Sequence, residues 1–170
     1  MITATRLLKH PHWIWLLLGG AATGIVLYLT RLGPGMGGDS TSYLMGAENL
    51  LLGNGFSRYS GGYEIRPING FPPFYSLAFA SLGSLGISLQ DGARVLNAVL
   101  FGANVVLVCW MVHWLTGSVV APLLAGLLCL TRPILLELHS WIMSEPLFIF
   151  LSLAGICLLG LYLWRFDLRF

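Results

Sequence analysis

The sequence predicts an all-α membrane protein with about four transmembrane helices and one or two juxtamembrane helices in a long first external loop. Hydrophobic residues make up 56% of the 170 residues, and charged residues only 9%. The mean hydropathy is +0.80, and a soluble domain of this size cannot bury so much apolar surface. The apolar residues also fall into long runs, and about 20 such residues cross a bilayer as a helix.

Charge and cysteine content exclude several classes of protein. The net charge is +2 and the nine basic residues form no patch, so we expect no nucleic-acid partner. Cys109, Cys129 and Cys157 lie inside apolar runs without paired spacing. We therefore expect them to be small buried side chains rather than disulfides or metal ligands.

Residues 12–30 form the first apolar run and are long enough for a span. Arg6 and Lys9 precede the run, which also suits a signal peptide, but the run is long and lacks a small-residue cleavage site at its end. We favour a retained span. Gly20 and Gly24 form a G-x-x-x-G pair, which predicts that another helix approaches closely here.

The external loop, residues 31–70, is too long for a simple turn, so we expect it to be functional or partly helical. A helix is predicted to start at residues 39–41, with Asp39 or Ser40 as its N-cap, and to end at Gly53 or Gly55. Apolar side chains follow at helical spacing along one face: Tyr43, Ala47, Leu50 and Leu51.

Four further apolar runs follow, at residues 71–89, 95–115, 119–130 (extendable to 138) and 146–164. If all were spans, the protein would have five. However, 71–89 is short, opens with a double proline and is rich in serine and glycine. These features favour a juxtamembrane helix at the interface.

The positive-inside rule also favours four spans. Four spans place Arg6, Lys9, Arg165 and Arg169 on one side, with only Asp167 among the acids. We therefore predict that residues 1–170 form a single transmembrane domain, integral to the bacterial inner (plasma) membrane, with both termini cytoplasmic. The remaining acids and arginines then lie on the external face, which becomes the candidate functional face.

Three polar motifs fall on that face: GDSTSY at 38–43, RPINGFPPFY at 66–75 and SWIMSEPL at 140–147. Their order and spacing resemble the N-terminal part of GT-C superfamily membrane glycosyltransferases, which use polyprenyl-phosphate sugars. The likeness is to the branch that includes protein mannosyltransferases and lipid A aminoarabinose transferases. It covers most of the chain, from about residue 13 to residue 164.

The resemblance implies transfer of a sugar from a polyprenyl-phosphate donor to an acceptor at the external membrane face. A lipid phosphate is a good leaving group, so such a site needs a carboxylate for the acceptor hydroxyl and positive charge for the phosphate. Asp39 matches the catalytic acid position, and Glu145 the second catalytic acid, which binds the acceptor or shares Mg²⁺ or Mn²⁺ with Asp39. Metal dependence stays open. The other implied site residues are phosphate-binding Arg66 and Arg58 and substrate-binding Tyr43, Tyr75 and Glu48.

Each of these residues also has a structural interpretation. Asp39 is a good N-cap, and Glu145 is a favourable acid at a helix N-terminus. Arg66 could extend to lipid headgroups, and His139 is more often structural than a ligand in such an apolar setting.

The chain departs from the family in length, because its members normally carry at least seven spans. We therefore also expect that it is a fragment, half of a split enzyme, or a non-catalytic accessory subunit of a larger membrane complex. The expected partners are membrane lipids, the polyprenyl-phosphate sugar donor, and another membrane protein or the missing C-terminal part.

Overall fold

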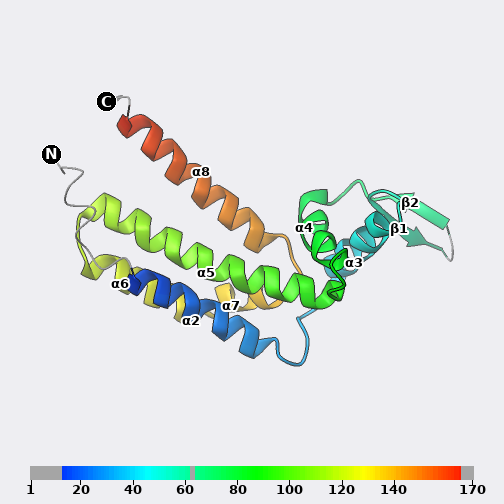
Figure 1. Cartoon of the computed structure of the whole chain (residues 1–170), viewed down its shortest axis with the longest axis horizontal. Coiled ribbons are helices and arrows are strands. Elements are labelled where there is room, and N and C mark those ends of the chain that lie inside the picture. Colours follow the sequence, from blue (N-terminus) through cyan, green and yellow to red (C-terminus); the bar gives the residue numbers. More distant parts are fainter. Residues whose placement is uncertain (1–12, 62–63, 166–170) are drawn as a thin grey trace.

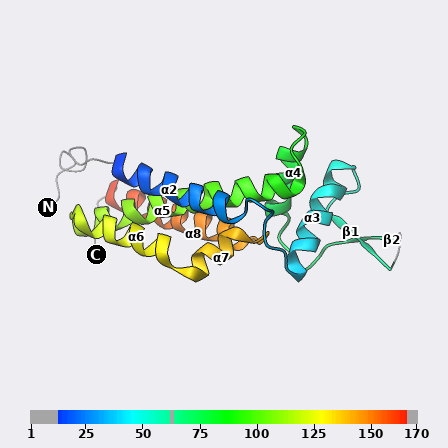
Figure 2. The same cartoon turned by 90° about the horizontal axis from the view of Figure 1, so that it is seen from below.

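The computed structural model describes residues 13–61 and 64–165, and the chain is mostly helical, at 74%. Five helices form an elongated bundle: α2 (Trp13–Leu29), α5 (Leu89–Thr116), α6 (Val120–Thr131), α7 (Pro133–Ser140) and α8 (Glu145–Arg165). The remaining elements gather at the end of the bundle where α5 begins, as Figures 1 and 2 both show. We call this group the head: α3 (Gly38–Leu51), β1 (Ser57–Ser60), β2 (Glu64–Pro67) and α4 (Pro73–Gly83).

Among residues 13–61 and 64–165, two helices are long and apolar enough to cross a membrane, α5 with 28 residues and α8 with 21. The pair α6 and α7 makes a third if it is one broken span, bent by 62°. The bend falls at Pro133, whose ring fixes φ and which has no N–H to donate to the preceding turn. Helix α2 has 17 residues and is shorter. The structure therefore supports two or three membrane-crossing helices, and the predicted count of four is not confirmed.

Helix α5 is the central element of the bundle, and Figure 1 shows α2 and α8 on opposite sides of it. It begins earlier than the predicted residue 95, because Ser88 Oγ accepts the N–H of Asp91 and caps the helix. It ends at Gly117, whose φ of 64° is the left-handed conformation that glycine adopts readily. Its 28 residues span about 42 Å, more than the ~30 Å hydrocarbon core.

Helices α2 and α5 approach closely at Gly19 and Gly102. A Cβ on Gly19 would lie 2.6 Å from Val106 Cγ2 and 2.9 Å from the Gly102 carbonyl oxygen. The prediction that Gly20 and Gly24 bring another helix close is wrong within this chain, because a Cβ on either glycine would meet nothing within 4 Å. Both belong to the exposed face of α2. The glycine of α2 that allows the close contact with α5 is therefore Gly19.

The three cysteines are free thiols, as expected. Cys109 and Cys157 are buried and Cys129 is half-buried. The Cys109 thiol donates to the carbonyl oxygen of Pro122, 3.3 Å away, and so links α5 to α6.

Helix α3 confirms the predicted helix in the external loop. It ends at Leu51, and Gly53 follows with a positive φ of 79°. Its N-cap is Gly37, so the prediction that Asp39 or Ser40 caps the helix is wrong. Ser40 Oγ instead accepts the N–H of Gly37 at 2.9 Å. Asp39 lies in the first turn, where a negative charge is favourable.

A β-hairpin in the loop at residues 31–70 was not predicted and corrects the all-α assignment. Strands β1 and β2 are antiparallel, with Ser57 opposite Pro67. Asn49 Nδ2 of α3 donates to Ser57 O at 3.0 Å and attaches the hairpin to α3. Ile68 N–H donates to Phe56 O at 3.1 Å and extends the pairing between the two arms of the hairpin.

A helix is confirmed within the predicted range 71–89, but it is shorter, as α4. Pro73 occupies its first turn, where a missing N–H costs nothing. The helix ends at Gly83, and Gly86, with a φ of 86°, turns the chain toward α5. Tyr75 and Phe79 are buried in the core that α4 shares with α3, α5 and the start of α8.

Candidate functional site

Two loops far apart in the sequence pair side by side beneath the head. Gly35 N–H donates to Ser140 O at 2.8 Å, and Ile142 N–H donates to Gly35 O at 2.9 Å, which makes a parallel bridge between Gly35 and Trp141. Position 35 requires glycine, because a Cβ there would lie 2.7 Å from the Trp141 indole. The segment that follows α2 is thereby fixed to the segment that precedes α8.

Two side chains of α3 extend this junction. Ser40 Oγ, fully buried, donates to the carbonyl oxygen of Ile142 at 2.8 Å. One turn later, the Tyr43 hydroxyl donates to Ser144 Oγ at 2.8 Å. The first turn of α3, which carries Asp39, therefore lies beside the start of α8, which carries Glu145.

Tyr75 of α4 also packs at this junction, against Tyr43. Its ring is 5.1 Å from the Tyr43 ring in an edge-to-face arrangement, a favourable aromatic geometry. Its hydroxyl donates to Asn97 Oδ1 of α5 at 3.1 Å. Ser76 Oγ donates to the backbone oxygen of Tyr43 at 2.9 Å. Tyr43 and Tyr75 are therefore both held rigidly next to the segment that carries Ser144.

The negative charges of both carboxylates act on the Tyr43 phenol. Burial raises the pKa of Tyr43, the hydrogen bond to Ser144 opposes that change, and the negative charges of Glu145 and Asp39 raise it further. Burial also raises the pKa of Tyr75, and Glu145 contributes in the same direction. Asp39 is exposed and Glu145 is half-buried, so both carboxylates remain accessible to a substrate.

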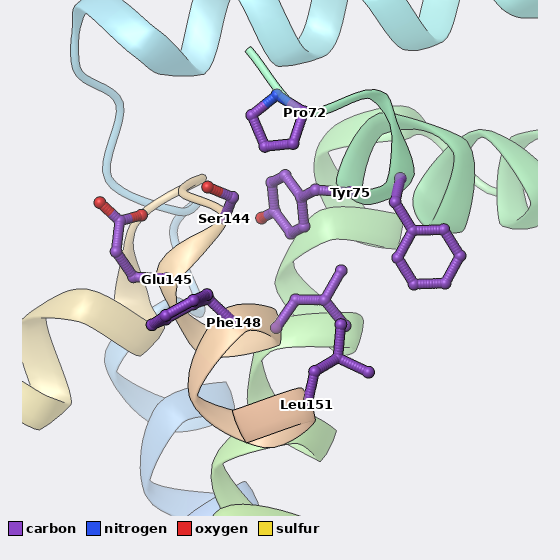
Figure 3. A pocket seen from close by; sticks show the side chains of 8 residues that line it. Pro72, Tyr75, Ser144, Glu145, Phe148 and Leu151 are labelled. Carbon is purple, nitrogen blue, oxygen red and sulfur yellow. The ribbon is translucent and has the colours of Figure 1, made fainter. Parts of the chain in front are cut away.

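A cavity of about 280 Å³ opens between the start of α4 and the start of α8. Figure 3 shows Tyr75 in the middle of the lining residues, with Ser144 and Glu145 together on one side of its ring. The walls are apolar apart from these oxygen-bearing groups, a composition that suits an apolar ligand with a polar end. The lining residues are Pro72, Phe74, Tyr75, Ser144, Glu145, Leu147, Phe148 and Leu151.

The predicted phosphate-binding arginines lie on a different part of the head. Arg58 and Arg66 face one another across the hairpin, and Arg66 pairs with Glu64 at 2.8 Å. The hairpin is attached to α3 at Asn49, ten residues or about 15 Å along the helix from Asp39.

Glu48 lies near that same far end of α3 and is exposed. The structure thus brings together Asp39, Tyr43, Tyr75 and Glu145, and it sets Glu48, Arg58 and Arg66 apart from them. The interpretation of His139 as structural is supported: its Nδ1–H donates to Leu135 O at 2.7 Å and the side chain is buried.

Sequence reasoning missed the asparagines of α5. Asn97 Nδ2 donates to Trp141 O at 2.7 Å, and Asn104 Nδ2 donates to Pro146 O at 3.3 Å. Both are buried. Two asparagines seven residues apart in an apolar span share one helix face, and that spacing was the available signal.

The described residues offer few ligands for a divalent metal ion. Within residues 13–61 and 64–165, no three histidine, cysteine, aspartate or glutamate side chains gather as a metal site. Asp39 and Glu145 supply carboxylate oxygens, the ligand type that Mg²⁺ and Mn²⁺ prefer. Mg²⁺ often takes only one or two carboxylates, with its other ligands from phosphate and water, so the pair fits an ion that the substrate helps to hold.

Comparisons with protein-family models, with curated proteins and with solved structures find no match to this chain. The functional assignment therefore depends on the residues and the geometry described above.

Proposed function

We propose that this chain is a membrane glycosyltransferase module that transfers a sugar from a polyprenyl-phosphate donor to an acceptor at the external membrane face. The observation that carries the proposal is the junction of the two loops, which joins the helix start that carries Asp39 to the helix start that carries Glu145. Glu145 lines a largely apolar cavity, which suits a substrate with a lipid tail and a polar, reacting head.

In this proposal Asp39 is the general base. Its exposed carboxylate orients the acceptor hydroxyl and accepts its proton as the hydroxyl attacks the anomeric carbon. Glu145, at the cavity rim, binds the acceptor or holds a divalent ion with Asp39. Such an ion, when bound, supplies the positive charge that stabilises the leaving phosphate.

Tyr43 and Tyr75 bind substrate in this scheme by different means. Both are protonated at neutral pH, as any phenol with a pKa near 10 is, and burial raises the pKa of each further. The Tyr43 hydroxyl fixes Ser144, and the Tyr75 ring forms a wall of the cavity. Arg58 and Arg66 retain the proposed role of phosphate binding only for a substrate long enough to reach the hairpin from Asp39.

We propose a four-crossing topology with both termini cytoplasmic in a bacterial inner membrane. Helix α2 packs along α5 at Gly19 and Gly102, which supports α2 as a crossing helix despite its 17 residues. Single cysteines at positions 39 and 145, in a chain without native cysteines, should react with an impermeant maleimide from the external side only. Labelling from opposite sides would rule out a shared site.

The function is tested by purified protein in liposomes with a panel of polyprenyl-phosphate hexoses and pentoses, measuring release of polyprenyl phosphate. Asp39→Asn should lower the rate about 100-fold or more, the usual contribution of a general base. Glu145→Gln should also lower it. The matched control is Glu137→Gln, an exposed acid on α7, which should change little. Equal rates in Asp39→Asn and Glu137→Gln would refute the assignment.

A second candidate is a non-catalytic accessory subunit of a larger membrane complex. The exposure of α8 favours it. Only 11% of the most apolar stretch of α8 is buried inside the protein, against 44% of that of α5. Such a surface must meet lipid or another membrane protein. This candidate predicts stable co-purification with a larger complex from native membranes, and no effect of Asp39→Asn on that complex.

A further inference from the structure

Two asparagines on one face of α5 hold the short segment that leads into α8. Asn97 Nδ2 donates to Trp141 O at 2.7 Å, and Asn104 Nδ2 donates to Pro146 O at 3.3 Å. Seven residues are almost two helical turns, so the two side chains project on one side about 10 Å apart. The two bonds therefore hold the segment 141–146 at its first and last residues, and Ser144 and Glu145 lie between these two points.

Each asparagine is itself held by a second hydrogen bond. Asn97 Oδ1 accepts the Tyr75 hydroxyl at 3.1 Å. Asn104 Nδ2 also lies 3.1 Å from His139 Nε2. Because His139 Nδ1 faces the carbonyl of Leu135, which can only accept, Nδ1 carries the proton and Nε2 accepts from Asn104. These contacts fix the orientation of both carboxamides.

Because both asparagines are buried, the loss of either hydrogen bond to residues 141–146 should be costly. Asn97 is 2% exposed and Asn104 5% exposed, so neither amide has ready access to water as a replacement partner. Leaving a buried carbonyl such as that of Pro146 unpaired costs the full desolvation of the group. The alternative is a shift of the segment toward other donors, and Glu145 would move with it.

We infer that Asn97 and Asn104 are positioning residues, which fix the carboxylate of Glu145 relative to Asp39 through the backbone of residues 141–146. The inference deepens the proposed function and rests on it for the catalytic consequence. Neither asparagine lines the cavity. Their effect on transfer is therefore indirect, through the geometry of the two carboxylates.

The primary test measures geometry without any activity. Spin labels at Thr41 of α3 and Phe148 of α8, both exposed, report the distance between the two carboxylate-bearing helix starts. The native cysteines are first replaced by alanine. Asn97→Leu and Asn104→Leu should each broaden the distance distribution. Asn97→Asp, nearly isosteric, keeps the acceptor for Tyr75 but loses the amide donor, and it should also broaden the distribution.

Asn49→Leu is the matched control. Asn49 is also a fully buried asparagine that donates to a backbone carbonyl, but that carbonyl belongs to Ser57 in the hairpin. This variant should leave the distance between α3 and α8 unchanged. Only variants that elute as monodisperse protein in detergent are compared, and Asn97→Asp is the variant least expected to disturb packing.

The second readout is the transfer assay. Asn97→Asp should lower kcat about 10- to 100-fold with little change in KM, as misplaced reacting groups do. An unchanged distance distribution in all three variants would overturn the inference, whether or not the protein transfers sugar. Failure of the wild type to transfer any sugar would instead overturn the proposed function, and the distance measurement would still decide the role of the asparagines.

Discussion

The head and the bundle are held together by different interactions. In the bundle, α2 and α5 meet through glycine backbones, and a Cβ on Gly102 would lie 2.7 Å from the Gly19 carbonyl oxygen. In the head, α3 reaches the start of α8 through directional hydrogen bonds, from Ser40 to Ile142 and from Tyr43 to Ser144. The bundle therefore depends on close packing of helix surfaces. The junction between α3 and α8 depends on a few hydrogen bonds between particular pairs of residues.

The largest expected effect is a loss of bundle stability in Gly102→Val. A Cβ at this position would meet the Thr23 hydroxyl oxygen and the Gly19 carbonyl oxygen of α2, and the carbonyl oxygen cannot rotate away as a side chain would. We expect a loss of about 3 kcal/mol in the free energy of unfolding, the upper part of the usual range for overpacking. Unfolding by sodium dodecyl sulfate in mixed micelles measures it.

Gly24→Val is the matched control for this prediction. A Cβ on Gly24 would meet nothing within 4 Å, so the stability should stay close to that of the wild type. Equal losses in the two variants would show that glycine-to-valine changes act through helix propensity alone, and close contact between α2 and α5 would lose its importance.

The next effect concerns the head. Ser40→Ala removes the donor of the buried bond to Ile142 O and the acceptor of the partly buried bond from Gly37 N–H. Unpaired buried groups cost about 1 to 3 kcal/mol, so we expect a loss near 2 kcal/mol in the same unfolding experiment.

Thr41→Ala provides the contrast. The Thr41 hydroxyl is exposed and bonds only to Gly38 O in its own helix, so its removal should cost less than about 0.5 kcal/mol. If Thr41→Ala proved as costly as Ser40→Ala, the bond to Ile142 would not be what joins the head to α8.

Tyr43→Phe should have a smaller effect on stability than Ser40→Ala. It removes one hydrogen bond, to Ser144 Oγ, and keeps the ring contacts with Tyr75 and Phe71. A single net hydrogen bond contributes about 1 kcal/mol. Tyr59→Phe, on the exposed hairpin, should change nothing measurable, and thermal unfolding of the detergent-solubilised protein compares the two.

The smallest effect is a spectroscopic one at Tyr75. Burial raises its pKa above the usual 10.0, so the neutral phenol is favoured in the folded state. The resulting stability is fully present below pH 10 and is lost as the pH rises from there through the folded-state pKa. At pH 10, wild type and Tyr75→Phe should therefore show equal tyrosinate absorbance. A deficit of half a tyrosinate in the variant would mean that Tyr75 ionises like an exposed phenol.

Local signals predicted part of the fold correctly. Helix α3 was predicted because a polar start, an apolar face and a terminating glycine all occur within its own sequence. The same kind of signal was overlooked at the start of α5, where Ser88 and Asp91 form a cap. The two β-strands were missed because each has only four residues, mostly exposed, and depends on Asn49 for its attachment.

The sequence predicted site residues correctly only where an acidic residue lies close to the end of an apolar run. Asp39 and Glu145 met that condition, and two hydrogen bonds join the helix starts that carry them. Arg58 and Arg66 were assigned by charge and by order in the chain, which do not reveal on which side of α3 the hairpin lies. Asn97 and Asn104 were missed because their partners are backbone carbonyls, which have no signature in a sequence.

The bond from Ser40 to Ile142 joins residues 102 positions apart, which has a consequence for biogenesis. During translation α3 emerges long before the ribosome has made residue 142, so its hydroxyl and phenol groups must wait in water or among headgroups. Closing so long a loop costs only slightly more entropy than closing a short one, so the delay is kinetic rather than energetic. The helix starts that carry Asp39 and Glu145 can join only after α5, α6 and α7 have been made, and a chain arrested before that point would carry the acid of α3 without its counterpart.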